Sequence, residues 1–164
     1  MRAESENPTG IDVVTYDPKY RDEFIRLNWQ WIEEYFAVED TDHHHLDDPE
    51  STIIEPGGDI IFLVDGDRVL GTCALVREAD GLFELAKMAV EKSARGRGLG
   101  DVLIEATINR ARELGATRIF LLSNRSLTPA ISLYRKHGFV EVPVDSDGGY
   151  ERADIKMVLE LESP

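Results

Sequence analysis

A loop rich in glycine and arginine, Arg95-Gly96-Arg97-Gly98-Leu99-Gly100, lies between a strand-like segment and a helical pattern. Glycine lets the backbone approach a ligand closely, and the first N–H groups of a helix have no acceptor within the helix. These amides and the helix dipole favour an anion, and arginine adds charge-assisted donors for phosphate oxygens. The loop therefore predicts a phosphate-binding site. The alternative is a structural turn that uses glycine for its geometry alone.

Two common phosphate-binding motifs do not fit this loop. A P-loop requires Gly-Lys-Ser/Thr, whereas Gly100 is followed by Asp101. A dinucleotide-binding fingerprint requires the spacing G-x-G-x-x-G, whereas the glycines here follow G-x-G-x-G. That fingerprint also requires an acidic residue at the end of the next strand, where this chain has Leu122-Ser123-Asn124-Arg125. If the loop binds phosphate, it therefore does so as part of a motif other than these two.

The loop resembles the R/Q-x-x-G-x-G/A motif of the GNAT superfamily of acetyl-CoA-dependent N-acetyltransferases. Downstream, the segment AISLYRKHGF (130–139) is similar to the second signature of that family, A-x-x-L-Y-x-x-x-G-F. The order of elements from Ile11 to Leu161 also resembles the family fold. Since this order of elements runs from residue 11 to residue 161, the resemblance covers nearly the whole chain. The two separate motifs agree with it.

The resemblance implies that acetyl-CoA is bound as a cosubstrate. In this family two parallel strands splay apart, and the pantetheine arm lies between them. The residues then expected to pair with that arm, and to polarise the thioester carbonyl through a backbone N–H, are Met88, Ala89 and Val90. The pyrophosphate is expected on the amides of Arg95, Gly96, Arg97, Gly98, Leu99, Gly100 and Asp101.

Two residues near the expected cofactor depart from a simple match. The family often carries an asparagine three residues before the alanine of its second signature, and here that position is Leu127. Asn124 is the nearest asparagine and is taken as its substitute. The Asp101 side chain suits a helix N-terminus but would repel phosphate, so we expect it to point outward.

The chemistry that the resemblance implies is attack of a neutral amine on a thioester. A lysine-like amine has a pKa of about 10.4, so a base must remove a proton near neutral pH. Glu84, six residues before Val90, resembles the catalytic glutamate of the histone-acetylating branch and is the candidate base, acting directly or through water. Tyr134, in the second signature, is the candidate acid for the leaving thiolate. The alternatives are a solvated strand glutamate and a core tyrosine.

The acceptor is expected to be an amine, and a cationic one. In the family it enters between the first helices and the turn joining the last strands. A mixed acidic and aromatic lining there suits a cation, through carboxylates and cation–π contacts. The residues that this chain offers are Glu33, Glu34, Tyr35, Phe36, the acidic stretch 39–48, Asp145, Asp147 and Tyr150.

Three consecutive histidines, His43-His44-His45, stand among aspartates and raise the question of a metal site. Neighbouring residues cannot all converge from one helix face, so we expect a polar surface loop or part of the acceptor site, and no metal. The only cysteine, Cys73, lies in an apolar run and is expected in the core, which favours direct transfer over an acyl-cysteine route.

Composition limits the partners. The 164 residues carry 32 acidic and 18 basic side chains, for a formal net charge of −14. Nucleic acid and anionic membranes would be repelled by this charge. With no long apolar segment, a cytoplasmic protein is expected. A homodimer is compatible with the sequence. A non-catalytic acyl-CoA sensor and an enzyme with another acyl donor, such as succinyl-CoA, stay open.

The elements that must position these residues follow from periodicity and turn signals. Residues 1–10 are expected to form a flexible tail and residues 11–164 a single N-acetyltransferase domain. Strands are expected at 11–16, 59–65, 69–78, 82–90, 118–124, 139–144 and 152–161. Helices are expected after Asp17-Pro18, within 38–58, from Leu99 to Leu114, and from an N-cap at Thr128 to Gly138.

The predicted fold class is α+β. We expect a mixed, mostly antiparallel sheet of six or seven strands, with a splayed parallel pair at its centre and about four flanking helices. This is the acyl-CoA N-acyltransferase fold that the resemblance implies. The parallel pair consists of strands 82–90 and 118–124, because a helical crossover joins them.

Overall fold

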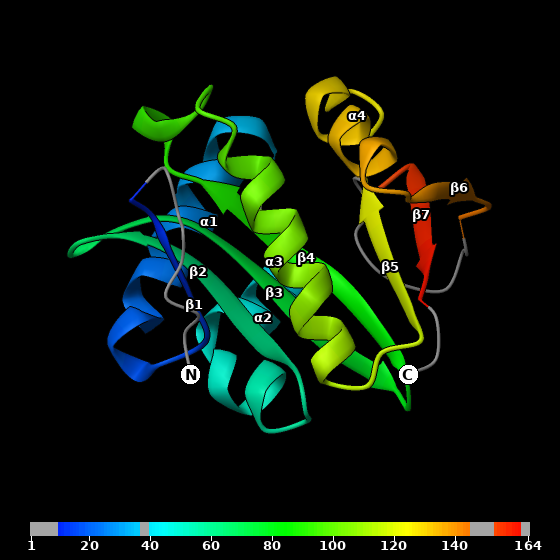
Figure 1. Ribbon diagram of the computed structural model, residues 1–164, viewed down its shortest axis with the longest axis horizontal. Helices are drawn as coiled ribbons and strands as arrows, with labels where there is room; N and C mark the ends of the chain where they lie inside the picture. The colour runs from blue at the N-terminus through cyan, green and yellow to red at the C-terminus, as the bar shows by residue number, and fades with distance from the viewer. Residues whose placement is uncertain (1–9, 37–39, 145–152, 162–164) are drawn as a thin grey trace.

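The computed structural model describes residues 10–36, 40–144 and 153–161. Within them, seven strands form one sheet in the order β1-β2-β3-β4-β5-β7-β6 (Figure 1). The strands are β1 (Asp12–Val14), β2 (Asp59–Asp65), β3 (Arg68–Ala79), β4 (Leu82–Val90), β5 (Arg118–Ser123), β6 (Val140–Val142) and β7 (Ile155–Glu160). All neighbouring strands are antiparallel except β4 and β5. The predicted fold class is therefore confirmed.

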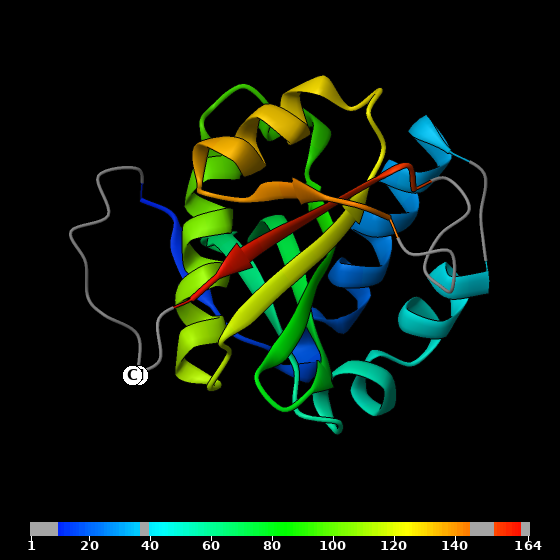
Figure 2. The same cartoon turned by 90° about the vertical axis from the view of Figure 1, so that its right-hand side faces the viewer.

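Helices cover both faces of the sheet, as Figure 2 shows. The longer helices are α1 (Arg21–Tyr35), α2 (Asp40–Asp47), α3 (Leu99–Glu113) and α4 (Thr128–Lys136), and the short ones are η1 (Pro18–Tyr20), η2 (Glu50–Ile54) and η3 (Lys92–Ala94). Helices α1 and α2 pack with η2 on one face, and α3 and α4 pack on the other. Each face has its own apolar core, so the sheet is buried on both sides.

Glycines close the two hairpins of the central meander. Gly66 joins β2 to β3 with φ +60°, and Gly81 joins β3 to β4 with φ +76°. Helix α3 then crosses to β5, which lies parallel to β4 as predicted. The helix ends before Gly115, whose φ of +88° is the left-handed conformation of a C-terminal cap.

The predicted helix caps agree with the structure at Asp17 but not at Thr128. Asp17 caps η1 as expected, because its carboxylate accepts from the Lys19 N–H at 2.9 Å. The prediction of Thr128 as N-cap is wrong: Leu127 is the cap residue, and no side chain caps the helix. The preceding turn is instead closed by Asn124, whose carbonyl accepts from the Leu127 N–H. Thr128 is therefore already the first helical residue.

The segment 38–58 holds two helical pieces, α2 and η2, where one short helix was expected. The expected tail lies almost wholly outside the described residues, as does the acidic turn between the last two strands. No helix in the described ranges has the length and apolarity needed to cross a membrane.

Candidate active site

The parallel pair at the centre of the sheet separates along its length. Residues Leu82–Glu84 pair with Arg118–Phe120, and beyond them β4 continues to Val90 without pairing with β5. A cavity of about 440 Å³ occupies the region where the two strands part. The N-terminal ends of α3 and α4 and residues of α1 also line it. The splayed pair therefore forms a site at which three helices and two strands meet.

Most of the residues singled out from the sequence meet at this cavity. Those that line it are Glu84, Met88, Ala89, Val90, Arg95, Gly96, Gly98, Leu99, Gly100, Asn124 and Tyr134. Arg97 and Asp101 do not line it. The cavity also brings in residues that were not predicted, among them Asn28 and Trp31 of α1 and Lys87 of β4.

The glycine loop turns twice before α3 begins. Gly96 and Gly98 have φ values of +83° and +76°, a region that residues with a side chain rarely adopt. A Cβ at either position would meet no atom within 4 Å, so glycine is required by the backbone conformation and not by packing. Gly98 is the cap residue of α3, and the amides of the first helical turn have no acceptor within the helix. The loop thus presents main-chain donors at the mouth of the cavity.

The side chain of Arg95 is held by contacts with other residues of the protein. Its Nε donates to the Val90 carbonyl at 3.2 Å, and its guanidinium lies 3.2 Å from the Glu34 carboxylate. These contacts tie the glycine loop to the end of β4 and to α1. An anion in the loop would therefore be held chiefly by main-chain N–H groups.

Asp101 directs its charge onto α4. Its carboxylate lies 2.8 Å from both the Lys136 ammonium and the His137 ring nitrogen Nε2. Contacts with Lys136 and then His137 hold the pKa of Asp101 below its usual range. This orientation agrees with the outward direction expected from the sequence.

The carboxyl of Glu84 lies where the strands begin to separate. The residue is 8% exposed and lines the cavity. Burial, followed by the charge of Glu78, raises the pKa of Glu84 to about 7, while Lys87 and Lys156 oppose the rise. A carboxyl with this pKa exchanges a proton near neutral pH, which suits general-base chemistry.

Tyr134 approaches the same cavity from α4. It is 8% exposed, and its ring packs edge-on against Phe139 at a centroid distance of 6.1 Å. Burial, the largest cause, raises the pKa of the phenol above its usual range. The hydroxyl therefore keeps its proton at neutral pH.

Cys73 is a core residue, as predicted. It is fully buried, and burial raises the pKa of its thiol to about 12. Cys73 does not line the cavity. The thiol therefore lacks the thiolate character that a nucleophilic cysteine needs.

The three histidines lie on helix α2, so the expectation of a surface loop is wrong. His43 and His44 are exposed, whereas His45 is buried, and burial lowers the pKa of His45 to about 4. In the part of the chain that the structure describes, no group of three or more His, Cys, Asp or Glu side chains is arranged to hold a metal ion.

The acceptor residues proposed from the sequence have different surroundings. Phe36 lines the cavity, Glu34 is paired with Arg95, and Glu33 is exposed. The side chain of Tyr35 and the residues Asp145, Asp147 and Tyr150 lie outside what the structure describes.

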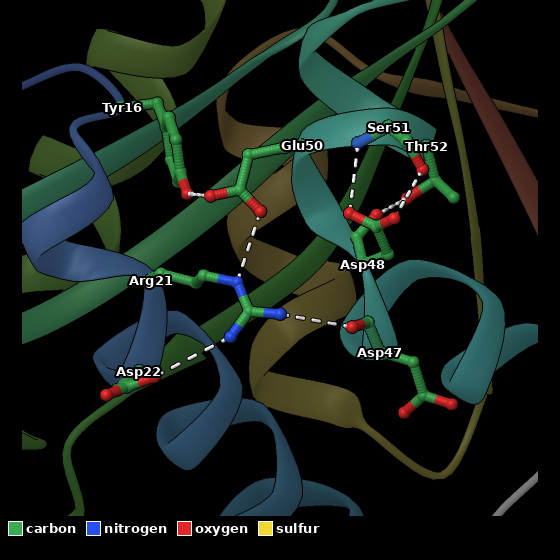
Figure 3. Close-up of polar contacts among 8 residues, drawn as sticks. All are labelled: Tyr16, Arg21, Asp22, Asp47, Asp48, Glu50, Ser51 and Thr52. Carbon is green, nitrogen blue, oxygen red and sulfur yellow. Dashed lines mark hydrogen bonds and ion pairs between the residues drawn. The ribbon is translucent and has the colours of Figure 1, made fainter.

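A polar network holds α2 and η2 against Tyr16 and the first residue of α1, Arg21 (Figure 3). Arg21 Nε donates to the Glu50 carboxylate at 3.1 Å, and another Arg21 nitrogen donates to the Asp47 carbonyl at 3.1 Å. The Tyr16 hydroxyl donates to the same Glu50 carboxylate. Helix α1 is thereby tied to the end of α2 and to η2.

Comparison with known proteins agrees with the fold and the motifs. The model of the acetyltransferase (GNAT) family matches residues 23–139. A mycothiol acetyltransferase of Corynebacterium glutamicum is 33% identical over 81 residues, which are 49% of this chain and 28% of that protein. The chain thus spans less than a third of the length of this relative.

Solved structures show the same fold. A GNAT-family acetyltransferase of Staphylococcus aureus superposes with a TM-score of 0.82 at 21% identity, over 93% of this chain and 99% of the other. The acetyltransferase yncA of Salmonella typhimurium, solved with its cofactor acetyl-CoA, superposes with a TM-score of 0.73 at 18% identity, over 93% and 95% of the two chains.

Proposed function

Because the chain belongs to the acetyltransferase (GNAT) family, we propose that it is an acetyl-CoA-dependent enzyme that acetylates a primary amine. The acetyl group passes directly to the acceptor in a ternary complex, and residues 11–164 act as one domain. The observation that carries the proposal is the cavity between β4 and β5, because a buried carboxyl, a buried phenol and a helix N-terminus all line it.

Acetyl-CoA supplies an acetyl thioester on an extended arm with a pyrophosphate, and the cavity suits each part. The edge of β4 at Met88, Ala89 and Val90 would hold the arm, since it has no strand partner on the β5 side. The amides of residues 95–101 would hold the pyrophosphate. Arg95 would contribute least to this contact, because its guanidinium is engaged with Glu34 and its main-chain N–H donates to the Lys92 carbonyl at 3.4 Å. Asn124 lines the cavity and would contact the arm.

Glu84 is the proposed base. With a pKa of about 7, its carboxylate is the dominant form above neutral pH and can accept a proton from the acceptor, directly or through water. A lower pKa would weaken the base, and a higher one would leave it protonated at neutral pH. The rate should therefore rise with pH through about 7, as Glu84 loses its proton.

Tyr134 is the proposed acid. Because its pKa is raised, the phenol is protonated throughout the neutral range and can donate to the leaving thiolate, whose thiol titrates at about 8.5. Cys73 takes no part, since a buried thiol with a pKa of about 12 is not a nucleophile near neutral pH.

Thiol release from acetyl-CoA across a panel of amines tests this function. We expect release that depends on the acceptor, and a loss of kcat of about tenfold or more in Glu84→Gln and in Tyr134→Phe. Both variants should still bind acetyl-CoA. Acetyl-CoA binding without acceptor-dependent thiol release would favour a sensor and contradict the proposal.

A further inference from the structure

The candidate base and the candidate acid belong to opposite faces of the sheet. Glu84 lies two residues before Ala86 in a regularly paired part of β4, and Ala86 packs in the core under α1. Tyr134 belongs to the core of the other face, which α3 and α4 cover (Figure 2). The glycine loop opens α3, so the proposed pyrophosphate site lies on that second face. The face that α1 covers is therefore the side from which an acceptor amine can approach Glu84.

Helix α1 turns one side toward this part of the cavity. Asn28, Trp31 and Ile32, at helical spacings of three and four, line the cavity together with Phe36, which follows the helix. The rings of Trp31 and Phe36 are partly buried, and their centroids are 5.3 Å apart. Trp31, Ile32 and Phe36 thus form an apolar wall, called the α1 wall below. Such a wall favours a ligand with apolar surface, and an aromatic ring most.

Asn28 supplies a polar atom beside the α1 wall. The residue is 1% exposed, and its Nδ2 donates to the Phe24 carbonyl one turn earlier at 2.9 Å. Among the described residues no donor binds its amide oxygen, Oδ1, so this acceptor is left for the cavity that Asn28 lines. A buried amide oxygen normally accepts a hydrogen bond. A primary amine has an N–H for it besides the proton that passes to Glu84.

The other charged side chains at the cavity are held in ion pairs. Lys87 stands at a β-bulge, where the register between β3 and β4 shifts, and its ammonium lies 2.8 Å from the buried carboxylate of Asp42. The guanidinium of Arg95 lies 3.2 Å from the Glu34 carboxylate. In the described ranges, Glu84 is the only carboxyl that lines the cavity. A second ammonium or a carboxylate on the acceptor would therefore be buried there without a partner from these residues, which is unfavourable.

We propose that the acceptor is a primary monoamine whose remaining part is apolar and aromatic. Its ring packs on the α1 wall, and its nitrogen lies between the Asn28 amide oxygen and the Glu84 carboxylate. This inference rests on the proposed acetyltransferase function and names its substrate class. The ammonium that becomes the reacting amine is then the only charge of the acceptor.

Matched amines test the substrate class on the unmodified enzyme. The kcat/KM for thiol release from acetyl-CoA is measured per concentration of neutral amine, because the amines differ in pKa. The comparison of 2-phenylethylamine with ethylamine isolates the ring, that of butylamine with 1,4-diaminobutane isolates a second ammonium, and that of 2-phenylethylamine with phenylalanine isolates a carboxylate. We expect about tenfold or more in favour of the ring, and about tenfold or more against each added charge.

The outcomes separate this inference from the function on which it rests. Thiol release with ethylamine equal to that with 2-phenylethylamine would overturn the inference and leave the acetyltransferase function standing. Diaminobutane or phenylalanine used as well as its uncharged counterpart would do the same. Thiol release with none of the amines, although acetyl-CoA is bound, would overturn both.

A tryptophan variant assigns the preference to the α1 wall. Trp31→Leu should lower the ratio of kcat/KM for 2-phenylethylamine to that for ethylamine by about threefold or more. This ratio does not depend on the fraction of folded enzyme, so a partly unfolded variant still reports it. Trp29→Leu is the matched control, because Trp29 packs against His43 and does not line the cavity, and the ratio should be unchanged. An unchanged ratio in Trp31→Leu would contradict the role of the wall.

An asparagine variant tests the hydrogen bond to the amine. Asn28→Leu keeps the volume of the side chain but removes Oδ1, so kcat/KM for 2-phenylethylamine should fall about three- to tenfold per acetyl-CoA-binding site. Counting the sites by acetyl-CoA binding removes the effect of any unfolded protein. Asn109→Leu, which changes an exposed asparagine of α3 outside the cavity, is the matched control and should leave kcat/KM unchanged. Equal kcat/KM in Asn28→Leu and the wild type would contradict the contact between Asn28 and the amine.

Discussion

Replacing Glu84 with glutamine should stabilise the protein at alkaline pH while it impairs catalysis. Burial raises the pKa of Glu84 from its ordinary value of 4.5 to about 7 in the folded chain. A raised pKa stabilises the fold below the unfolded-state value, and this contribution is lost as pH rises through the folded value. At 1.36 kcal/mol per pH unit, the loss between pH 4.5 and pH 8.5 approaches about 3 kcal/mol. Glutamine cannot ionise, so the variant avoids that loss.

Urea unfolding without acetyl-CoA measures this effect. The free energy of unfolding of Glu84→Gln minus that of the wild type should be near zero at pH 4.5 and should reach about 3 kcal/mol at pH 8.5. For a chain of this size, the corresponding change in melting temperature is about 6–12 °C. The matched control is Glu105→Gln, which changes an exposed glutamate of α3 and should show no such dependence on pH. A difference for Glu84→Gln that stays constant from pH 4.5 to 8.5 would refute the claim that this carboxyl is buried with a raised pKa.

Three further changes test other parts of the site. Glu78→Gln removes a charge that raises the pKa of Glu84, so the acidic limb of the pH profile of kcat/KM should move to lower pH, and a shift to higher pH would contradict the assignment. Gly98→Ala forces a side chain into a backbone with φ +76°, which should destabilise the fold by about 1–2 kcal/mol in urea and weaken acetyl-CoA binding measured by calorimetry. Asp42→Asn leaves the Lys87 ammonium buried without its carboxylate, and a loss of stability of about 3–5 kcal/mol is expected at pH 7, whereas a loss below 1 kcal/mol would show that this pair is solvated.

Local sequence signals were sufficient for the strands, the glycine loop and the ends of α3. Hairpin turns and alternating apolar residues act over a few positions, so the meander from β2 to β4 could be predicted directly. The separation of β4 from β5 was implied by the family resemblance, not by the residues of either strand. The structure shows it as a pairing that ends at Glu84 and Phe120.

The features that the sequence did not reveal depend on long-range pairing. The bulge at Lys87 is set by the register between β3 and β4, and the neighbouring residues in the sequence do not indicate it. The partner of Lys87, Asp42, lies 45 positions earlier in the chain. It belongs to a helix whose bounds could not be predicted, because the apolar residues around it show no helical periodicity. Thr128 has the residue type of an N-cap, but the turn before it is already closed by Asn124.

The most direct test is a crystal structure of the protein grown with saturating acetyl-CoA. We predict that pyrophosphate oxygens lie within hydrogen-bonding distance of main-chain N–H groups of residues 95–101, with the arm between β4 and β5. Acetyl-CoA bound elsewhere, or no acetyl-CoA bound at all, would contradict the proposal that the gap and the glycine loop are its site.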